Sequence, residues 1–484
     1  MQYTFKPFYW QMSEDDSLVR TAQVLYSENL DLTSNTKFVT LSPKPKQLLV
    51  TSDKVQAIYF LERGIDKPLF GDDSKKIYLD NQLKYTASLD VRMFWSNSKY
   101  LYWLDYGEDI YRILLTDVSG SWTWKVTKTE DALENDSGKW FVVEQEWVAF
   151  IWYGTKLYEI SNDTWQLVNQ YDFLFEKIVW MIDARDVIEI IQKDWKVQSW
   201  DRVSDTANSY DLWIRVAIVV QSANERFLIW EWSVYIVSGA EKNKVAWQYN
   251  SDVLEMNKFK FRELENSNVW FLKDVVYLGT DSINTIAPAD NFVQFGHSSV
   301  LMLGNKKSGL PVGMSKYINT SSDGSKYTEI YGMTTKSTAY SGYNDTLYIT
   351  YKNANWVYWV DYVDLDEQNF TTSQEWILIL PEFDGGNDDI EKRMTKLSVR
   401  ADWGNDAGKF YLYKVEKGVL VPFNWTRDLS FVKHTDWVRK KELTVKENFH
   451  NITLAIVFKQ DADTPKNDAL KLYSLTIDYE PVGR

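Results

Sequence analysis

The chain has 484 residues, of which 44% are hydrophobic and 25% are charged. A chain of this length exceeds one ordinary core, so we expect about two to three domains, or one large repetitive domain with an appendage. Because 68 acidic residues against 54 basic ones give a formal charge of −14, the chain repels phosphates, and we expect no sequence-specific nucleic-acid binding. The lack of cysteine excludes disulfides, thiolate metal ligands and cysteine nucleophiles. No apolar run approaches the roughly 20 residues of a membrane-spanning helix.

Residues 1–45 are predicted to form an N-terminal arm. The segment from Met1 to Pro7 has neither the basic nor the apolar part of a secretion signal, so we expect no export by the usual route. Asp15 to Leu25 is the best helix candidate of the chain, and an irregular arm is the alternative for it.

Residues 46–386 consist almost entirely of short segments rich in Val, Ile, Tyr, Phe, Thr and Trp, each ended by Asn, Asp, Gly, Ser or Lys. Such segments are typical of β-strands. They come in clusters of three or four strands within about 40 to 50 residues, which is the size of one propeller blade. We therefore predict a β-propeller-like domain of about six or seven blades. No blade carries a Gly-His and Trp-Asp or a kelch signature, and a pair of β-sandwiches is the alternative.

Residues 387–484 differ in character from the preceding region. The polar segment Asp384–Asp389 is predicted to be a hinge, so we place a domain boundary near residue 387. After it, Leu397–Ala401, Phe410–Val415 and Ile452–Phe458 alternate between apolar and polar residues. This alternation predicts a small antiparallel β-sandwich, and the whole chain is expected to be all-β.

The tryptophans are unusual in number and position. The chain has 23 Trp but only 21 Gly, whereas roughly 34 Gly are expected at the usual 7%. Several Trp stand where tight turns ask for glycine, namely Trp147, Trp165, Trp195, Trp356, Trp425 and Trp437. If these positions held glycine, several of the segments would become Asp-Gly or Asn-Gly hairpin turns.

One hypothesis for these positions is an alternative genetic code, in which UGA is read as glycine but was translated here as tryptophan. A protein truly rich in surface aromatics, as carbohydrate binders are, is the competing interpretation. By contrast, Trp95, Trp103, Trp200 and Trp359 lie inside strand patterns and are expected to be ordinary core residues.

No catalytic, cofactor-binding or metal-binding residue is assigned from the sequence. His297, His434 and His450 have no metal-ligand spacing, and they are expected to be structural. The segment Gly304–Leu310 contains Lys307-Ser308 but lacks the Gly-x-x-x-x-Gly-Lys spacing of a phosphate-binding loop, and it is read as an ordinary loop. Arg439-Lys440-Lys441, the clearest basic cluster, is read as a solvated strand face.

Two acidic segments are candidate calcium sites. Asp364 and Glu375 stand at the first and twelfth positions of a partial calcium-loop template, but Asn369 replaces its glycine. The second candidate comprises Asp384, Asn387, Asp388 and Asp389, for which a solvated hinge is the simpler interpretation. Paired carboxylates for glycoside hydrolysis carry no signal in a chain with 68 acidic residues.

Ser321–Tyr327 resembles a degenerate Asp-box turn of sialidase-like propellers. Such turns are structural even in that family. The segment is therefore expected to stabilise a loop and not to bind a ligand.

The order of features in the chain resembles structural proteins of tailed-bacteriophage virions, particularly propeller-bearing neck and tail proteins. The resemblance rests on Leu18–Leu25 leading to Asn29-Leu30-Asp31, on the propeller-like middle, and on a last domain from Lys396–Ala401 to Leu472–Pro481. It is architectural and covers most of the chain, but none of these segments is a specific motif.

The resemblance implies a non-enzymatic protein that assembles in the host cytoplasm into a virion, where it contacts other virion proteins and copies of itself. An extracellular glycan-binding or glycan-cleaving β-propeller is the main alternative. A bacterial scaffold propeller in the cytoplasm is a further one.

Overall fold

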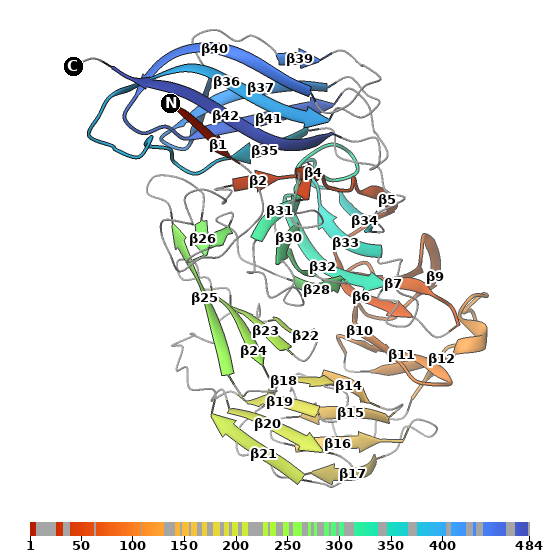
Figure 1. Cartoon of the computed structure of the whole chain (residues 1–484). Helices are drawn as coiled ribbons and strands as arrows, with labels where there is room; N and C mark the ends of the chain where they lie inside the picture. Colours follow the sequence, from red (N-terminus) through yellow and green to blue (C-terminus); the bar gives the residue numbers. More distant parts are fainter. Residues whose placement is uncertain are drawn as a thin grey trace.

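The computed structural model of the chain is all-β in the part that it describes, as predicted (Figure 1). It describes residues 1–5, 26–31, 39–61, 64–107, 109–129, 141–145, 148–153, 156–161, 167–171, 178–183, 188–192, 196–201, 206–211, 226–230, 233–238, 245–250, 255–263, 270–272, 275–277, 285–289, 292–296, 300–303, 314–336, 346–365, 375–402, 408–422, 429–431, 439–460 and 470–482. Within these ranges the one helical element is the 3₁₀ turn η1 (Leu115–Asp117). The helix predicted at Asp15–Leu25 and the loop Gly304–Leu310 lie outside them. The domain limits at residues 45 and 387 stay predictions.

Four antiparallel sheets follow one another in the first half of the chain, and each contains four strands in chain order. They are β6 (Val55–Leu61), β7 (Lys67–Asp72), β8 (Lys76–Leu79) and β9 (Gln82–Thr86); β10 (Val91–Ser96), β11 (Tyr100–Asp105), β12 (Ile110–Leu114) and β13 (Thr127–Lys128); β14 (Phe141–Gln145), β15 (Val148–Tyr153), β16 (Lys156–Ile160) and β17 (Leu167–Tyr171); and β18 (Ile178–Asp183), β19 (Ile188–Gln192), β20 (Lys196–Asp201) and β21 (Thr206–Asp211).

Three further sheets continue this series. A six-stranded sheet contains β22 (Arg226–Trp230), β23 (Ser233–Ser238), β24 (Val245–Asn250), β25 (Glu255–Glu263), β26 (Trp270–Leu272) and β27 (Val275–Tyr277). The next strands, which begin a ten-stranded sheet, are β28 (Thr285–Ala289), β29 (Phe292–Gly296), β30 (Val300–Leu303) and β31 (Met314–Ile318). The last sheet consists of β32 (Glu329–Lys336), β33 (Thr346–Lys352), β34 (Tyr358–Asp364) and β5 (Lys46–Thr51).

The first strands of these sheets lie next to one another in a closed circle. Each strand contacts the next in the order β6, β10, β14, β18, β22, β28 and β32, and β32 contacts β6 again. Figure 1 shows these strands on the inner side of the sheets that they begin. The last sheet joins both ends of the circle, because β5 pairs antiparallel with β34 and places Leu49 opposite Val360.

A recurrent turn between the second and third strands of a sheet is formed by an Asp or Asn side chain at its start. Asp72, at the end of β7, accepts hydrogen bonds at Oδ1 from the backbone N–H groups of Ser74 (3.1 Å) and Lys76 (2.9 Å). Asn353, just after β33, accepts at Oδ1 from the residues at the same offsets, Asn355 (3.0 Å) and Val357 (2.9 Å). A short polar side chain that binds backbone two residues ahead reverses the chain direction.

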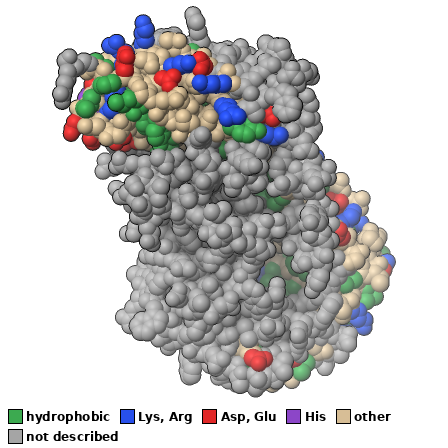
Figure 2. Space-filling model, viewed as in Figure 1, with side chains coloured by type: hydrophobic (Ala, Val, Ile, Leu, Met, Phe, Trp, Pro, Cys, Tyr) green, Lys and Arg blue, Asp and Glu red, His purple; other side chains and the backbone are tan. Residues whose placement is uncertain are grey.

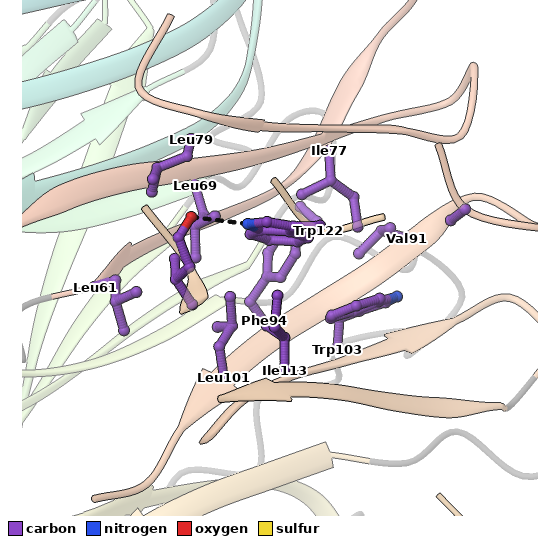
Figure 3. Close-up of a cluster of buried hydrophobic side chains, with 13 residues drawn as sticks. Leu61, Leu69, Ile77, Leu79, Val91, Phe94, Leu101, Trp103, Ile113 and Trp122 are labelled. Atoms are coloured by element: carbon purple, nitrogen blue, oxygen red, sulfur yellow. Dashed lines mark hydrogen bonds between the residues drawn. The ribbon is translucent and has the colours of Figure 1, made fainter. Parts of the chain in front are cut away.

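Hydrophobic side chains fill the space between the first two sheets. The cluster between the first two sheets includes Leu101, Trp103 and Trp122, whose side chains are fully buried (Figure 3). The rings of Trp103 and Trp122 stack with centroids 5.7 Å apart, and Trp122 Nε1 donates to the Val118 carbonyl (2.8 Å). Trp95, Trp103 and Trp200 are buried as predicted, and the half-buried Trp359 packs against the cluster near β33.

The C-terminal strands form two layers. One sheet contains β36 (Lys392–Asp402), β40 (Arg439–Phe449) and β42 (Lys471–Pro481) together with β1 (Gln2–Phe5), β3 (Leu30–Asp31) and β4 (Val39–Leu41). The other is the second part of the ten-stranded sheet, with β2 (Tyr26–Glu28), β35 (Glu375–Ile379), β41 (Leu454–Gln460), β37 (Gly408–Glu416), β38 (Val419–Pro422) and β39 (Leu429–Phe431). These sandwich-like sheets agree with the predicted period-two alternation.

Contacts between the two layers hold them face to face. The ring of Phe383, whose backbone bridges to Ile452, lies 5.9 Å from Phe449 and 5.3 Å from Tyr479, measured between centroids. Lys414 of β37 forms an ion pair with Glu447 of β40 at 2.8 Å. Figure 2 shows basic and acidic side chains on the outside of the body that carries these strands.

Two leucines of similar chemistry test this packing. Leu101 is fully buried in the cluster of Figure 3, whereas Leu83 is 53% exposed on β9. We expect Leu101→Ala to lower the free energy of unfolding by about 2–5 kcal/mol, and Leu83→Ala to change it by about 0.5 kcal/mol or less. Urea denaturation measures both, and equal losses would contradict the described packing.

Candidate functional site

A loop between β31 and β32 contacts three other parts of the chain. We name residues 319–327 the clamp loop. An isolated bridge between Thr320 and Lys326 closes it, and Gly324 adopts φ +84°, a left-handed conformation that suits glycine. The loop includes the Ser321–Tyr327 segment that resembles an Asp-box, and the structure places this segment in a hydrogen-bonded turn.

Asp323 organises the interior of the clamp loop. Its Oδ1 accepts hydrogen bonds from the hydroxyls of Ser321 (2.5 Å) and Ser325 (2.7 Å), and its Oδ2 accepts one from Asn353 Nδ2 (3.0 Å). Burial by itself would raise the pKa of Asp323, but these hydrogen bonds to the ionised carboxylate lower the pKa below its ordinary value. The same residue therefore fixes the loop and ties it to the turn before β34.

Asp361 holds the clamp loop against β34. This residue of β34 is fully buried, and it accepts hydrogen bonds from the Ser322 N–H (2.9 Å), the Ser322 hydroxyl (2.6 Å) and the Tyr327 hydroxyl (3.2 Å). Burial raises the pKa of Asp361 to about 6, even though the Ser322 hydrogen bonds act in the opposite direction. Burial also raises the pKa of Tyr327 well above its ordinary value, so its hydroxyl keeps the proton that it donates.

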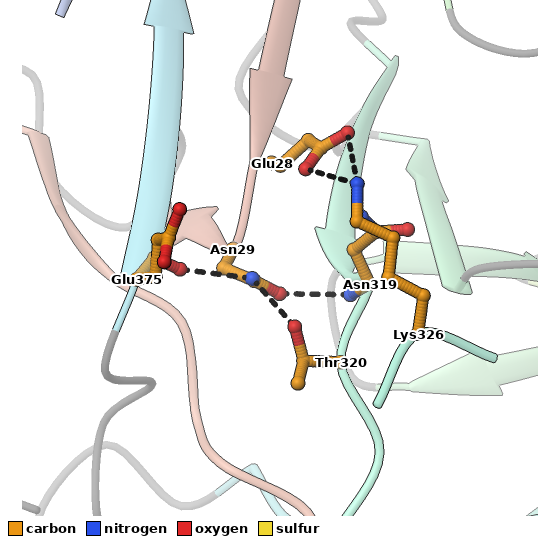
Figure 4. A network of polar contacts seen from close by, with 6 residues as sticks. All are labelled: Glu28, Asn29, Asn319, Thr320, Lys326 and Glu375. Carbon is orange, nitrogen blue, oxygen red and sulfur yellow. Dashed lines mark hydrogen bonds and ion pairs between the residues drawn. The ribbon is translucent and has the colours of Figure 1, made fainter. Parts of the chain in front are cut away.

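Asn29 joins the clamp loop to the N-terminal and C-terminal segments (Figure 4). Its Nδ2 donates to Thr320 Oγ1 (3.1 Å) and to the Glu375 carbonyl (2.9 Å), and its Oδ1 accepts from the Asn319 N–H (2.8 Å). Asn29 is 5% exposed and has φ +55°, which Asn tolerates better than most residues. One buried amide thus connects its own segment to two others, the clamp loop and β35, which lie 290 or more residues away.

Strand β2 reinforces the same junction. Its residue Glu28 lies opposite Lys316 of β31 in a parallel pair, and Ser27 lies opposite Leu378 of β35 in an antiparallel pair. The buried Glu28 carboxylate forms an ion pair with Lys326 of the clamp loop at 3.2 Å. Strand β2 therefore lies in the middle of the ten-stranded sheet, between β31 of the circle and β35 of the C-terminal layers.

The two acidic segments considered as calcium sites form ion pairs and turns. Glu375 forms an ion pair with Lys459 at 2.9 Å, and residues 366–374 lie outside the described residues. Asp384 and Asn387 accept hydrogen bonds from backbone N–H groups of their own turn, those of Gly386 (2.7 Å) and Asp389 (2.9 Å). Within the ranges given above, no group of three or more His, Asp or Glu residues is arranged to hold a metal ion.

The described residues among the histidines and the basic cluster contact other residues of the chain. Nδ1 of the exposed His450 donates to the Asp388 carbonyl (3.1 Å), while His297 and His434 lie outside the described part. Lys440 of the basic cluster forms an ion pair with Glu442 (2.9 Å). Among the described residues, no helix is both long and apolar enough to cross a membrane.

Two residues of the junction were missed by sequence reasoning. Asp361 carries a weak signal, because it is an acidic residue inside the strand segment Tyr358–Asp364. Asn29 carries almost none, since asparagine is common in turns. Both depend on partners that are far away in the sequence.

Comparisons with known proteins identify no relative by sequence. No protein-family model and no curated protein matches the chain. Among solved structures, the computationally designed Ika8 protein is similar with a TM-score of 0.41 and 12% sequence identity, over 66% of this chain and 99% of that one. A likeness of this size carries no argument about fold or function.

Asn29 is the first residue to test. We expect Asn29→Ala to lower the free energy of unfolding by about 2–4 kcal/mol, because buried polar partners lose their hydrogen bonds and because alanine disfavours a positive φ. Asn29→Gly removes the same hydrogen bonds but tolerates the backbone, so it should lose less. Chemical denaturation compares the three proteins. A glycine variant as stable as the parent would show that the amide contacts contribute nothing.

Asp361 is expected to make stability fall as pH rises. Its pKa is about 6 in the folded chain and about 3.9 in an unfolded one, so the folded state binds more protons between these values. The contribution of Asp361 to the free energy of unfolding is complete below about pH 4. It is lost as pH rises through about 6, and the total loss is about 3 kcal/mol.

The measurement is the free energy of unfolding of the parent and of Asp361→Asn from pH 4 to pH 7. The asparagine variant should gain relative to the parent as pH rises. Asp323→Asn is the control, because the pKa of Asp323 is lowered in the folded chain and its contribution to stability is lost only as pH falls below about 4. Its difference from the parent should therefore stay nearly constant over this range. A constant difference between the parent and Asp361→Asn would contradict this role.

Proposed function

We propose that the circle of sheets is a β-propeller of seven blades. The support is the closed series of contacts from β6 through β32 and back to β6. A further support is β5, which completes the sheet of β32, β33 and β34 from the other end of the chain. Such a closure joins the first and last parts of a ring by main-chain hydrogen bonds.

We propose that the chain is a non-enzymatic structural protein of a phage virion, a neck or tail component that acts through protein–protein contacts. The observation that carries the proposal is the junction at Asn29 and β2, where three distant segments are fixed by buried polar contacts. A component that transmits load between neighbours needs its parts fixed to each other. Buried hydrogen bonds and a shared sheet supply that rigidity.

Exposed apolar residues at strand edges support contacts with other proteins. The outer strand β17 has Leu167 at 44% and Val168 at 61% exposure, and Val419 at the start of β38 is 63% exposed. An edge strand with apolar side chains offers both backbone groups and hydrophobic surface to a partner. In this proposal the partners are other virion proteins and copies of the same chain, assembled in the host cytoplasm.

One observation favours the glycan-binding alternative. Trp356 is 75% exposed beside Lys352, whose Nζ lies 3.4 Å from the centroid of the indole ring and 6.0 Å from that of Tyr358. Exposed aromatic rings next to a polar side chain are a surface on which a sugar ring stacks. The alternative therefore depends on residue 356 being a true tryptophan.

The location of the protein in a particle tests the proposal. Antibodies against the chain should label the neck or tail of purified virions in electron microscopy, and mass spectrometry of the particles should detect its peptides. A glycan array probed with the same protein should stay unlabelled. Particles that lack the chain, or strong binding to one glycan, would refute the structural role.

A further inference from the structure

Trp356 occupies a backbone position that suits glycine. It is the fourth residue of the turn that begins at Asn353, it has φ +65°, and its N–H donates to the Asn353 carbonyl (3.0 Å). The equivalent residue of the Asp72 turn, Lys75, has φ +69°. The fold therefore requires a left-handed residue here, and the side chain contributes nothing to that requirement.

Trp124 occupies a second position of this kind, which the turn pattern in the sequence did not indicate. The Lys125 N–H donates to the Trp122 carbonyl (3.0 Å), and Trp124 stands third in this four-residue turn with φ +67°. A turn with a positive φ at its third residue is the type that requires glycine there. Trp122, two residues earlier, is fully buried, whereas Trp124 is 98% exposed.

The energies favour glycine at both positions. A left-handed conformation costs a residue with a Cβ atom about 1–2 kcal/mol. At 98% exposure the ring of Trp124 gains nothing from burial. The contact of Lys352 with Trp356 contributes only about 0.5–1 kcal/mol at an exposed site. Neither tryptophan therefore compensates for the conformation that its position imposes.

We infer that residues 124 and 356 are glycine in the natural protein, encoded by UGA codons that its own host reads as glycine. The buried tryptophans Trp95, Trp103, Trp122, Trp200 and Trp376 are true tryptophans with UGG codons. Glycine at these two positions would account for part of the shortage of glycine in the chain.

This assignment changes the surface of the protein. With glycine at residue 356, the aromatic ring beside Lys352 is absent, and the surface that favours glycan stacking is lost. The inference does not rest on the proposed virion role, because a glycan-binding protein from the same host would carry the same codons.

The codons decide the assignment directly. We expect UGA at positions 124 and 356 and UGG at positions 103 and 122, read from the gene. Mass spectrometry of the protein purified from its natural source should show glycine at 124 and 356. A UGG codon at either of these two positions, or a tryptophan in the corresponding natural peptide, would overturn the inference.

A stability measurement tests the backbone requirement separately. We compare the printed sequence with the double variants Trp124→Gly/Trp356→Gly and Trp124→Ala/Trp356→Ala. At ordinary positions alanine stabilises more than glycine, but at a positive φ the order reverses. The glycine variant should have a Tm roughly 2–4 °C above the alanine variant.

The matched control for this comparison is Trp122, which lies in the same turn but is buried. Trp122→Gly should lower the Tm strongly, because it removes a fully buried ring and the hydrogen bond to Val118. An alanine double variant as stable as the glycine one, or a glycine double variant less stable than the printed sequence, would contradict the requirement for glycine.

Discussion

The buried amide of Asn29 is the contact on which the arrangement of the described parts depends. It binds Asn319, Thr320 and the Glu375 backbone at once, so the clamp loop, β35 and the N-terminal segment are held at a single point. A buried donor or acceptor without its partner costs about 1–3 kcal/mol. Any displacement of one segment breaks several of these bonds together, which is why the junction favours one arrangement over a range of them.

The residues that close the circle of sheets lie next to those that attach the C-terminal layers. The clamp loop follows β31, and it binds Asp361 on β34, the strand that also pairs with β5. The carboxylate is kept in a fully buried place where ionisation is unfavourable, and hydrogen bonds from Ser322 and Tyr327 partly offset that cost. The strand that closes the ring is thereby connected, through one loop, to the residues that hold the sandwich.

The tryptophans divide into two classes by their surroundings. Trp103 and Trp122 stack within the core, and Trp122 satisfies its indole N–H. Trp124 and Trp356 lie in solvent with left-handed backbones. Only the first class has the packing that explains a tryptophan. The distinction bears on function, because the apparent aromatic surface at Trp356 belongs to the second class.

The sequence by itself determined the all-β class, the turn at Asn353–Trp356 and the burial of Trp95, Trp103 and Trp200, because these follow from local alternation, turn chemistry and hydrophobicity near each residue. It also identified Ser321–Tyr327 as a structural turn. Only the tertiary structure decided that β5 pairs with β34, that β2 lies between β31 and β35, and that Asn29 and Asp361 are central residues. The physical reason is that the pairings of β2 and β5 and the contacts of Asn29 depend on partners about 290 or more residues away, and those of Asp361 on partners more than 30 residues away. A single polar residue in a strand or turn carries no local record of such a partner.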